Sequence, residues 1–195
     1  MTGVQTCALP IYEEGSNSRF SQDQLNDLTK NIFLQMIYGE ILDVGLIQTK
    51  VNDFASSLTN QRPSYTLRQK CGMDRNDYIA VDLLGNVMTC QNTGGIGKHR
   101  LGHVRSLDKV ELTTATHWSL KQECQSCPVL QLCKGSCMYL EGEQWAASCN
   151  SEFALNKGIL AGALFFITGM MLERIEGEMI RPSLPEKNDM EMSRS

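Results

Sequence analysis

Cysteine is the chemically distinctive residue of this 195-residue sequence. Eight cysteines are present, and seven of them fall within 79 residues, at Cys71, Cys90, Cys124, Cys127, Cys133, Cys137 and Cys149. The last five follow the spacing CX2CX5CX3C and then, after eleven residues, a further cysteine. The first two flank Gly85, with thirteen residues before the glycine and four after it. Thiols at this density form disulfides, structural zinc sites or iron–sulfur clusters.

The three chemistries differ in what they require of the spacing. An odd number of cysteines argues against a closed disulfide framework. Zinc sites commonly use two CX2C-like pairs, whereas only Cys124 and Cys127 form such a pair here. Cubane clusters take thiolates from scattered loop positions. The spacing therefore favours iron–sulfur clusters, with zinc and disulfides as the alternatives.

The complete pattern of seven cysteines and one glycine resembles the signature of SPASM domains, over about residues 65–150. These domains hold auxiliary clusters at the C-terminal end of many radical SAM enzymes that modify peptides and proteins. The resemblance implies two [4Fe–4S] clusters. Auxiliary cluster I would be held by Cys71, Cys90 and Cys137, and auxiliary cluster II by Cys124, Cys127, Cys133 and Cys149.

Auxiliary cluster I is then one thiolate short of the four that a cubane takes. Some members of the family carry another cysteine shortly after the first, where this sequence has Asp74 and Asp77. An open iron, an aspartate ligand and a substrate-binding site all remain possible expectations. An open iron could act as a Lewis acid toward a peptide group.

The SAM-cleaving cluster of radical SAM enzymes needs a CX3CX2C loop, which the sequence lacks. After Cys133 and Cys137 the third position is Leu140. The resemblance therefore implies a parent enzyme that binds SAM and a third [4Fe–4S] cluster in an upstream part. The parent would mature a ribosomally made peptide or a protein, with an electron donor such as flavodoxin or ferredoxin. We expect this chain to be inactive alone. The alternatives are a stand-alone electron-transfer module and a zinc-binding interaction domain.

Composition adds limits to this interpretation. The sequence is 42% hydrophobic and 21% charged, as in ordinary globular proteins. The net charge of −4 gives no sign of a nucleic-acid partner. The apolar stretch at residues 158–172 is fifteen residues without a charge, whereas a membrane helix needs about 20. We expect a cytoplasmic protein with no membrane contact, because free thiols and clusters persist in reducing surroundings.

The fold class predicted is α+β, in five segments. Residues 1–11 resemble a translated sequencing adapter and are treated as a scar, so that the natural protein would continue upstream. Residues 12–64 would be the end of a partial (β/α)6 radical SAM barrel. Residues 65–150 would form the SPASM domain with a β-hairpin, residues 151–178 a long helix, and residues 179–195 a disordered tail.

Local signals place several elements more closely. Ser21 and Gln24 form a capping box that starts a helix, which Gly39 ends. Residues 41–47 are predicted as a short strand or loop, and residues 51–58 as a second helix ending before Pro63.

Later in the chain, residues 78–90 alternate around Gly85 as a hairpin. Residues 102–107 lead into a short helix with Ser106 as its N-cap. The three histidines lack ligand spacing and are expected to pack or lie at the surface; they are His99, His103 and His117.

Overall fold

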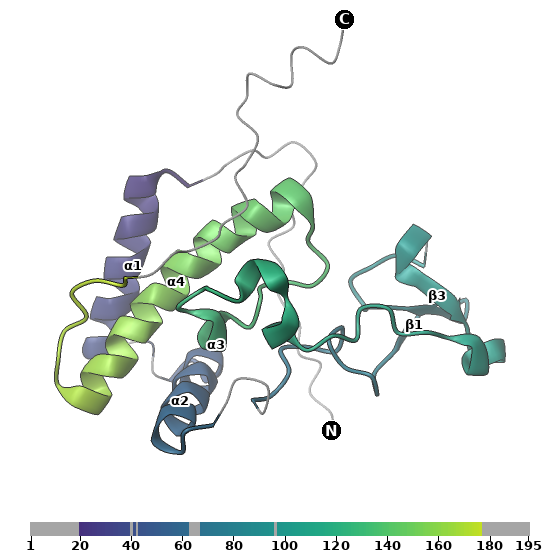
Figure 1. Ribbon diagram of the computed structural model, residues 1–195. Coiled ribbons are helices and arrows are strands. Elements are labelled where there is room, and N and C mark those ends of the chain that lie inside the picture. Colours follow the sequence, from purple (N-terminus) through teal and green to yellow (C-terminus); the bar gives the residue numbers. More distant parts are fainter. Residues whose placement is uncertain (1–19, 40, 42, 63–66, 96, 177–195) are drawn as a thin grey trace, which may run out of the picture.

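The computed structural model describes residues 20–39, 41, 43–62, 67–95 and 97–176. The expected scar, the expected tail, residues 177–178 of the expected long helix and Pro63 lie outside these residues. The described part is mixed helix and sheet, which confirms the α+β class at that level. Three helices and a short fourth form one half, and a small sheet forms the other (Figure 1).

Helix α1 spans Gln22–Ile37 and begins where the capping box predicted. The Ser21 hydroxyl accepts from the Gln24 backbone N–H, and the Gln24 side chain accepts from the Ser21 N–H. Gly39 has a φ of +81°, in the left-handed region that glycine adopts without steric cost. The chain therefore leaves the helix at this residue, as expected.

Helix α2 spans Gly45–Thr59, so the expected strand or loop at residues 41–47 is only partly right. A turn closes from the Val44 N–H to the Ile41 carbonyl, and the helix begins directly afterwards. Ile47 is buried and continues the apolar face of Val51 and Phe54 at helical spacing. In the described residues 20–62 there are two helices and no barrel strand.

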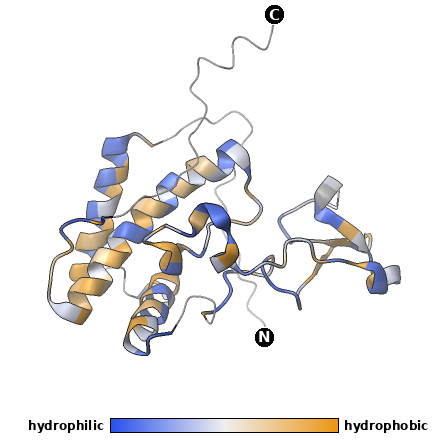
Figure 2. Ribbon diagram, in the orientation of Figure 1, coloured by the Kyte–Doolittle hydropathy of each residue, from blue (hydrophilic) through white to orange (hydrophobic). Residues whose placement is uncertain are grey.

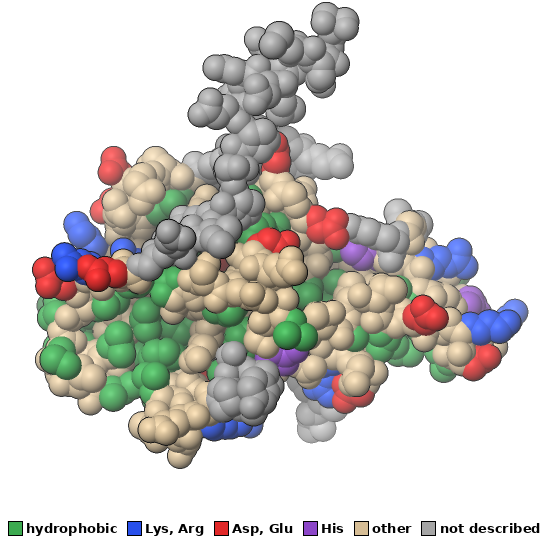
Figure 3. Space-filling view, in the orientation of Figure 1, with side chains coloured by type: hydrophobic (Ala, Val, Ile, Leu, Met, Phe, Trp, Pro, Cys, Tyr) green, Lys and Arg blue, Asp and Glu red, His purple; other side chains and the backbone are tan. Residues whose placement is uncertain are grey.

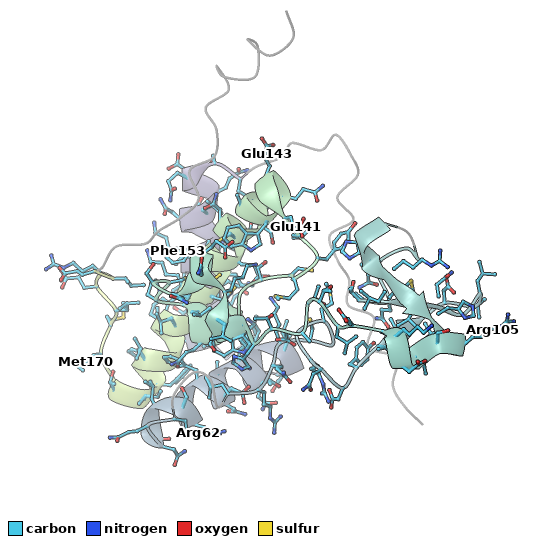
Figure 4. All side chains as sticks on the ribbon, turned by 45° about the vertical axis from the view of Figure 1, so that its right-hand side comes forward. Arg62, Arg105, Glu141, Glu143, Phe153 and Met170 are labelled. Atoms are coloured by element: carbon cyan, nitrogen blue, oxygen red, sulfur yellow. The ribbon has the colours of Figure 1, made fainter. Side chains whose placement is uncertain are left out.

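Helix α4 spans Gly142–Thr168, and this corrects the expected helix at residues 151–178. It begins nine residues earlier than predicted, so Cys149 lies inside the helix and the boundary at residue 150 falls within an element. It also ends ten residues earlier, because Gly169 adopts a φ of +73°. Figure 4 shows Glu141 and Glu143 at the start of α4 and Phe153 farther along it.

The helical half is built on α4, against which α1, α2 and the short helix α3 (Leu130–Cys133) all pack. Its core contains Val129 and residues from each of these helices. Figure 2 shows the concentration of hydrophobic residues there. The fully buried members are Met36, Ile159 and Ala163. No helix among the described residues is long and apolar enough to cross a bilayer.

The sheet half has three antiparallel strands in the order β1 (Ala80–Val81), β2 (Asn86–Met88) and β3 (Arg100–His103). The β1–β2 hairpin with Gly85 at its turn (φ +84°) confirms the prediction for residues 78–90. The third strand was not predicted. Arg105, just after β3, lies at the end of the sheet far from the helices (Figure 4).

The predicted helix cap at Ser106 is wrong. The 3₁₀ segment Val104–Lys109 starts at His103, whose side chain accepts from the Arg105 N–H. Ser106 itself has φ −144° and ψ 49°, which breaks the segment internally. The His103 imidazole therefore supplies the capping acceptor that was expected from the Ser106 hydroxyl.

Hydrophobic side chains also gather on the visible surface of the helical half (Figure 3). In this half Tyr38 is 74% exposed, and Leu46, Met170 and Met171 are 64–67% exposed. On the sheet half, Leu83 and Leu84 are fully or largely exposed at the hairpin turn.

Candidate metal centre

The cysteines from Cys124 to Cys149 sit on a chain of tight turns around α3. Cys124 ends a 3₁₀ segment, and its carbonyl accepts from the Cys127 N–H at 2.9 Å. The Cys127 carbonyl in turn accepts from the Leu130 N–H at 3.1 Å. Cys133 is the last residue of α3, and Cys149 projects from α4. These cysteines therefore lie on tight turns, at the end of a short helix and inside a long one.

Three other thiols act electrostatically on Cys124. Burial raises the pKa of Cys124 to about 12; nearby Lys121 opposes this, and the thiols of Cys133, Cys149 and Cys127 raise the pKa further. These three thiols are thus near enough to act on Cys124 electrostatically. The resemblance implies that the same three cysteines share a cluster with Cys124, and this grouping stays a prediction.

Several of the thiols accept backbone N–H groups. The pKa of Cys133, raised mainly by burial, is partly lowered by a hydrogen bond from the Ser136 backbone. Partial desolvation of its sulfur raises the pKa of Cys71, although the residue as a whole is exposed, and hydrogen bonds from the Met73 and Asp74 backbones oppose that shift. The Asn92 N–H lies 3.4 Å from the Cys90 sulfur. Such donors favour the thiolate, the form that binds metals.

The loop between Cys133 and Cys137 is strained. Lys134, Gly135 and Ser136 have φ values of 56°, 79° and 62°, three consecutive left-handed residues. Each non-glycine residue of this kind costs about 1–3 kcal/mol and persists only where its surroundings hold it.

Each residue of the loop is held by a different element. Lys134 pairs with Asp53 of α2 at 3.1 Å. The Gly135 carbonyl accepts from Lys121 Nζ at 3.3 Å. The Ser136 hydroxyl lies 3.1 Å from that of Ser148 in α4. The strain is maintained by the fold, as is common at functional sites.

The left-handed turn separates the two cysteines that flank it. Cys133 packs against the helical core, together with Cys127. Cys137 packs instead against a second buried cluster, here called the Trp145 cluster, formed by Cys124, Leu140, Trp145 and Ala146. Cys149 and Leu130 also pack against the Trp145 cluster. In an ordinary helix, two residues four apart would share a face. The left-handed turn instead directs Cys133 and Cys137 to different clusters.

A polar network surrounds Cys133 and was not foreseen from the sequence. Lys50 Nζ donates to the Leu132 carbonyl at 2.5 Å and to Asn156 Oδ1 at 2.9 Å. The Asn156 amide donates to Glu152 Oε2 at 3.0 Å, and the Cys133 thiol lies 4.0 Å from the same oxygen. Burial lowers the pKa of Lys50, while the charges of Glu152 and Cys133 oppose that shift. The network places one cation and one carboxylate beside a predicted ligand.

Cys71 and Cys90 lie toward the sheet half. Cys71 is exposed and Cys90, just after β2, is half-buried. The two aspartates considered as extra ligands are engaged elsewhere. Asp74 is 1% exposed and accepts from the backbone N–H groups of Lys70 and Cys71, at 2.8 and 3.2 Å. Asp77 pairs with Arg75 at 2.6 Å.

The histidines have structural partners, which confirms their expected packing role. His117 Nε2 lies 3.1 Å from the Leu67 carbonyl, and His103 Nε2 lies 3.1 Å from the Leu84 carbonyl. His99 Nδ1 lies 3.0 Å from the Thr89 hydroxyl.

Among the described residues, no three His, Cys, Asp or Glu side chains already form a group that could hold a metal ion. None of the seven described cysteines is in a disulfide. Four soft thiol donors would nevertheless suit an iron–sulfur cluster or zinc chemically. Binding would therefore require the thiols to move closer and lose their protons.

Sequence reasoning missed Trp145, Lys50 and Asn156. Of these three, only Trp145 could have been found from the sequence. It lies four residues before Cys149, and residues four apart share a face in a helix such as α4, which begins at Gly142. No family model, curated protein or solved structure matches the chain.

Proposed function

We propose that the chain binds iron–sulfur clusters through its seven cysteines between residues 71 and 149. The observation that carries this proposal is the spacing of the seven cysteines and Gly85, and it is supported by the electrostatic influence of Cys127, Cys133 and Cys149 on Cys124. A cubane takes four thiolates, and these four would hold auxiliary cluster II. Further support comes from the N–H donors to Cys71, Cys90 and Cys133, because hydrogen bonds to sulfur stabilise and tune such clusters.

The second predicted set, Cys71, Cys90 and Cys137, would hold auxiliary cluster I. Asp74 and Asp77 are poor candidates for its fourth ligand, because backbone N–H groups and Arg75 already occupy their oxygens. We therefore favour an iron whose fourth position is open to substrate or solvent. Such a position gives the cluster a Lewis-acid capacity when it is bound.

We propose further that this cluster-binding chain is the C-terminal part of a radical SAM/SPASM enzyme that matures a ribosomally made peptide or a protein. Support comes from the complete cysteine and glycine spacing. The residues of this chain would hold the auxiliary clusters, which pass electrons or position the substrate. A donor such as flavodoxin or ferredoxin would supply the electrons. SAM and its cleaving cluster would belong to the upstream part.

Zinc is the second candidate, because four cysteine thiolates also suit a structural zinc site and Cys124-X2-Cys127 is a zinc-type pair. Anaerobic reconstitution with iron and sulfide separates the two. Two bound cubanes give a brown protein with about 8 irons and acid-labile sulfide. A colourless protein that retains stoichiometric zinc and no sulfide would refute the iron–sulfur proposal.

Single substitutions test which thiols share a cluster. Cys124→Ala should deplete one spectroscopic species and Cys137→Ala the other, each leaving about 4 irons. Cys7→Ala is the matched control, since Cys7 lies outside the cysteine pattern, and should leave the iron content unchanged. Loss of the same species from the Cys124 and Cys137 variants, with a different one lost from Cys71→Ala, would refute the assignment.

A further inference from the structure

The indole N–H of Trp145 is buried without a hydrogen-bond partner. Within the part of the chain that the structure describes, it is the one fully buried side-chain nitrogen or oxygen in this condition. Trp145 is 6% exposed. Buried tryptophan N–H groups usually have an acceptor, because leaving one unpaired is costly. An unsatisfied donor of this kind calls for a specific explanation, such as a missing bound group.

The surroundings of the indole offer sulfur. Trp145 belongs to a buried cluster with Cys124, and Cys137 and Cys149 pack against the same cluster. Leu140 and Ala146 complete the Trp145 cluster, and Leu130 packs against it. A neutral thiol is a weak acceptor, whereas a metal-bound thiolate or an inorganic sulfide carries negative charge and accepts more strongly.

The Lys121 ammonium packs against the Trp145 ring. Lys121 Nζ sits 4.6 Å from the centre of the Trp145 ring. Its ammonium also donates to the Gly135 carbonyl in the strained loop. The indole is therefore fixed by its packing and by Lys121, and its one polar atom remains available to an anionic acceptor.

We propose that the Trp145 N–H donates a hydrogen bond to a sulfur of the centre held by Cys124, Cys127, Cys133 and Cys149. This inference rests on the proposed function. Trp145 is then a positioning residue whose indole orients the sulfur and tunes the centre. A hydrogen bond to sulfur stabilises the reduced form more than the oxidised form, because reduction adds negative charge. The bond should therefore raise the midpoint potential of this centre.

The substitution Trp145→Phe removes the N–H and keeps an aromatic ring. Its matched control is Trp118→Phe, because Trp118 is also buried but its Nε1 donates to the Arg68 carbonyl at 3.0 Å. Both variants of the full chain are reconstituted anaerobically and titrated with dithionite under EPR detection. Trp145→Phe should lower the reduction constant of one cluster about tenfold, which is about 59 mV for one electron. Trp118→Phe should leave both clusters unchanged.

A second measurement keeps the native residue at position 145. The Trp118→Phe chain contains Trp145 as its single tryptophan, so ¹⁵N-indole label reports on this ring alone. Pulsed EPR of the reduced protein should detect a ¹⁵N coupling, and Trp145→Phe should abolish it.

The outcomes separate the inference from the proposal beneath it. If the reconstituted protein shows clusters, but the potential is unchanged in Trp145→Phe and no ¹⁵N coupling appears, the Trp145 bond is refuted and cluster binding stands. If no iron–sulfur cluster forms in the wild-type chain, the proposed function fails, and the inference fails with it.

Discussion

The crossing of α1 over α4 gives a prediction whose size can be worked from the structure. Two glycines of α4 lie at the crossing. A Cβ on Gly158 would stand 2.7 Å from the Thr29 carbonyl oxygen and 2.8 Å from Ile32 Cβ. A Cβ on Gly162 would stand 2.7 Å from Met36 Sδ and 2.8 Å from Met36 Cε. Both contacts are shorter than van der Waals packing allows, but the neighbours differ in their freedom to move.

Two opposing terms decide the effect of an alanine at each position. Replacing a glycine inside a helix by alanine gains up to about 1 kcal/mol in helix propensity. Overpacking a core costs about 1–3 kcal/mol. At Gly158 the obstacle is backbone, so α1 itself must shift, and Gly158→Ala should destabilise by about 1–2 kcal/mol. At Gly162 the obstacle is the end of a flexible methionine, so Gly162→Ala should change stability by less than about 1 kcal/mol.

The assay is urea unfolding of the metal-free chain under reducing conditions, followed by circular dichroism. Gly45→Ala is the control, because this glycine also lies in a helix and its added Cβ would meet nothing within 4 Å. That variant should be neutral or slightly stabilised. If Gly158→Ala and Gly45→Ala changed the free energy of unfolding equally, α1 would not be in tight contact with α4 at Gly158.

Three further predictions concern buried polar groups of the metal-free chain. The pKa of Cys124 is raised from 9.0 to about 12, so its contribution to stability is complete below pH 9 and is lost as the pH rises toward 12. In Cys124→Ala the free energy of unfolding, measured with urea, should therefore fall less steeply between pH 9 and about pH 12. An unchanged slope of that free energy against pH would contradict the raised pKa of Cys124. Asp74→Asn should destabilise by about 1–2 kcal/mol, because it weakens two hydrogen bonds to backbone N–H groups; exposed Asp77→Asn is its control and should show no measurable change. Trp118→Phe should lower the free energy of unfolding by about 2–3 kcal/mol, because it removes the hydrogen bond to the Arg68 carbonyl and leaves a cavity. Trp145→Phe should lower it less. A lower melting temperature for Trp145→Phe than for Trp118→Phe would count against an unpartnered Trp145 N–H.

Sequence reasoning succeeded where a signal was contained in a few neighbouring residues. The Ser21–Gln24 capping box fixed the start of α1, and Gly85 with its alternating flanks fixed the hairpin. The start of α4 was missed because Glu141, its N-cap, makes no side-chain capping bond. Its end was missed because the apolar run continues past Gly169, and apolar character does not reveal a left-handed residue.

The candidate centre shows the same division. The resemblance grouped Cys127, Cys133 and Cys149 with Cys124, and these are the thiols that act electrostatically on it; that they share a cluster stays a prediction. The sequence pattern could not find Lys50, which reaches Cys133 through residues of α3 and α4 that lie far away in the sequence. Nor could it find an indole N–H without an acceptor, because that fact depends on every neighbour in three dimensions.

The pairing of α1 with α4 also has a consequence for synthesis on the ribosome. The Thr29 hydroxyl donates to the Ala154 carbonyl, 125 residues later, and Gly158 lies against Thr29 and Ile32. The apolar faces of α1 and α2 thus stay uncovered until α4 has been made. All seven cysteines of the pattern are translated before that point. A nascent chain therefore contains all seven thiols while its helical half is still open, and the completed α4 closes that half afterwards.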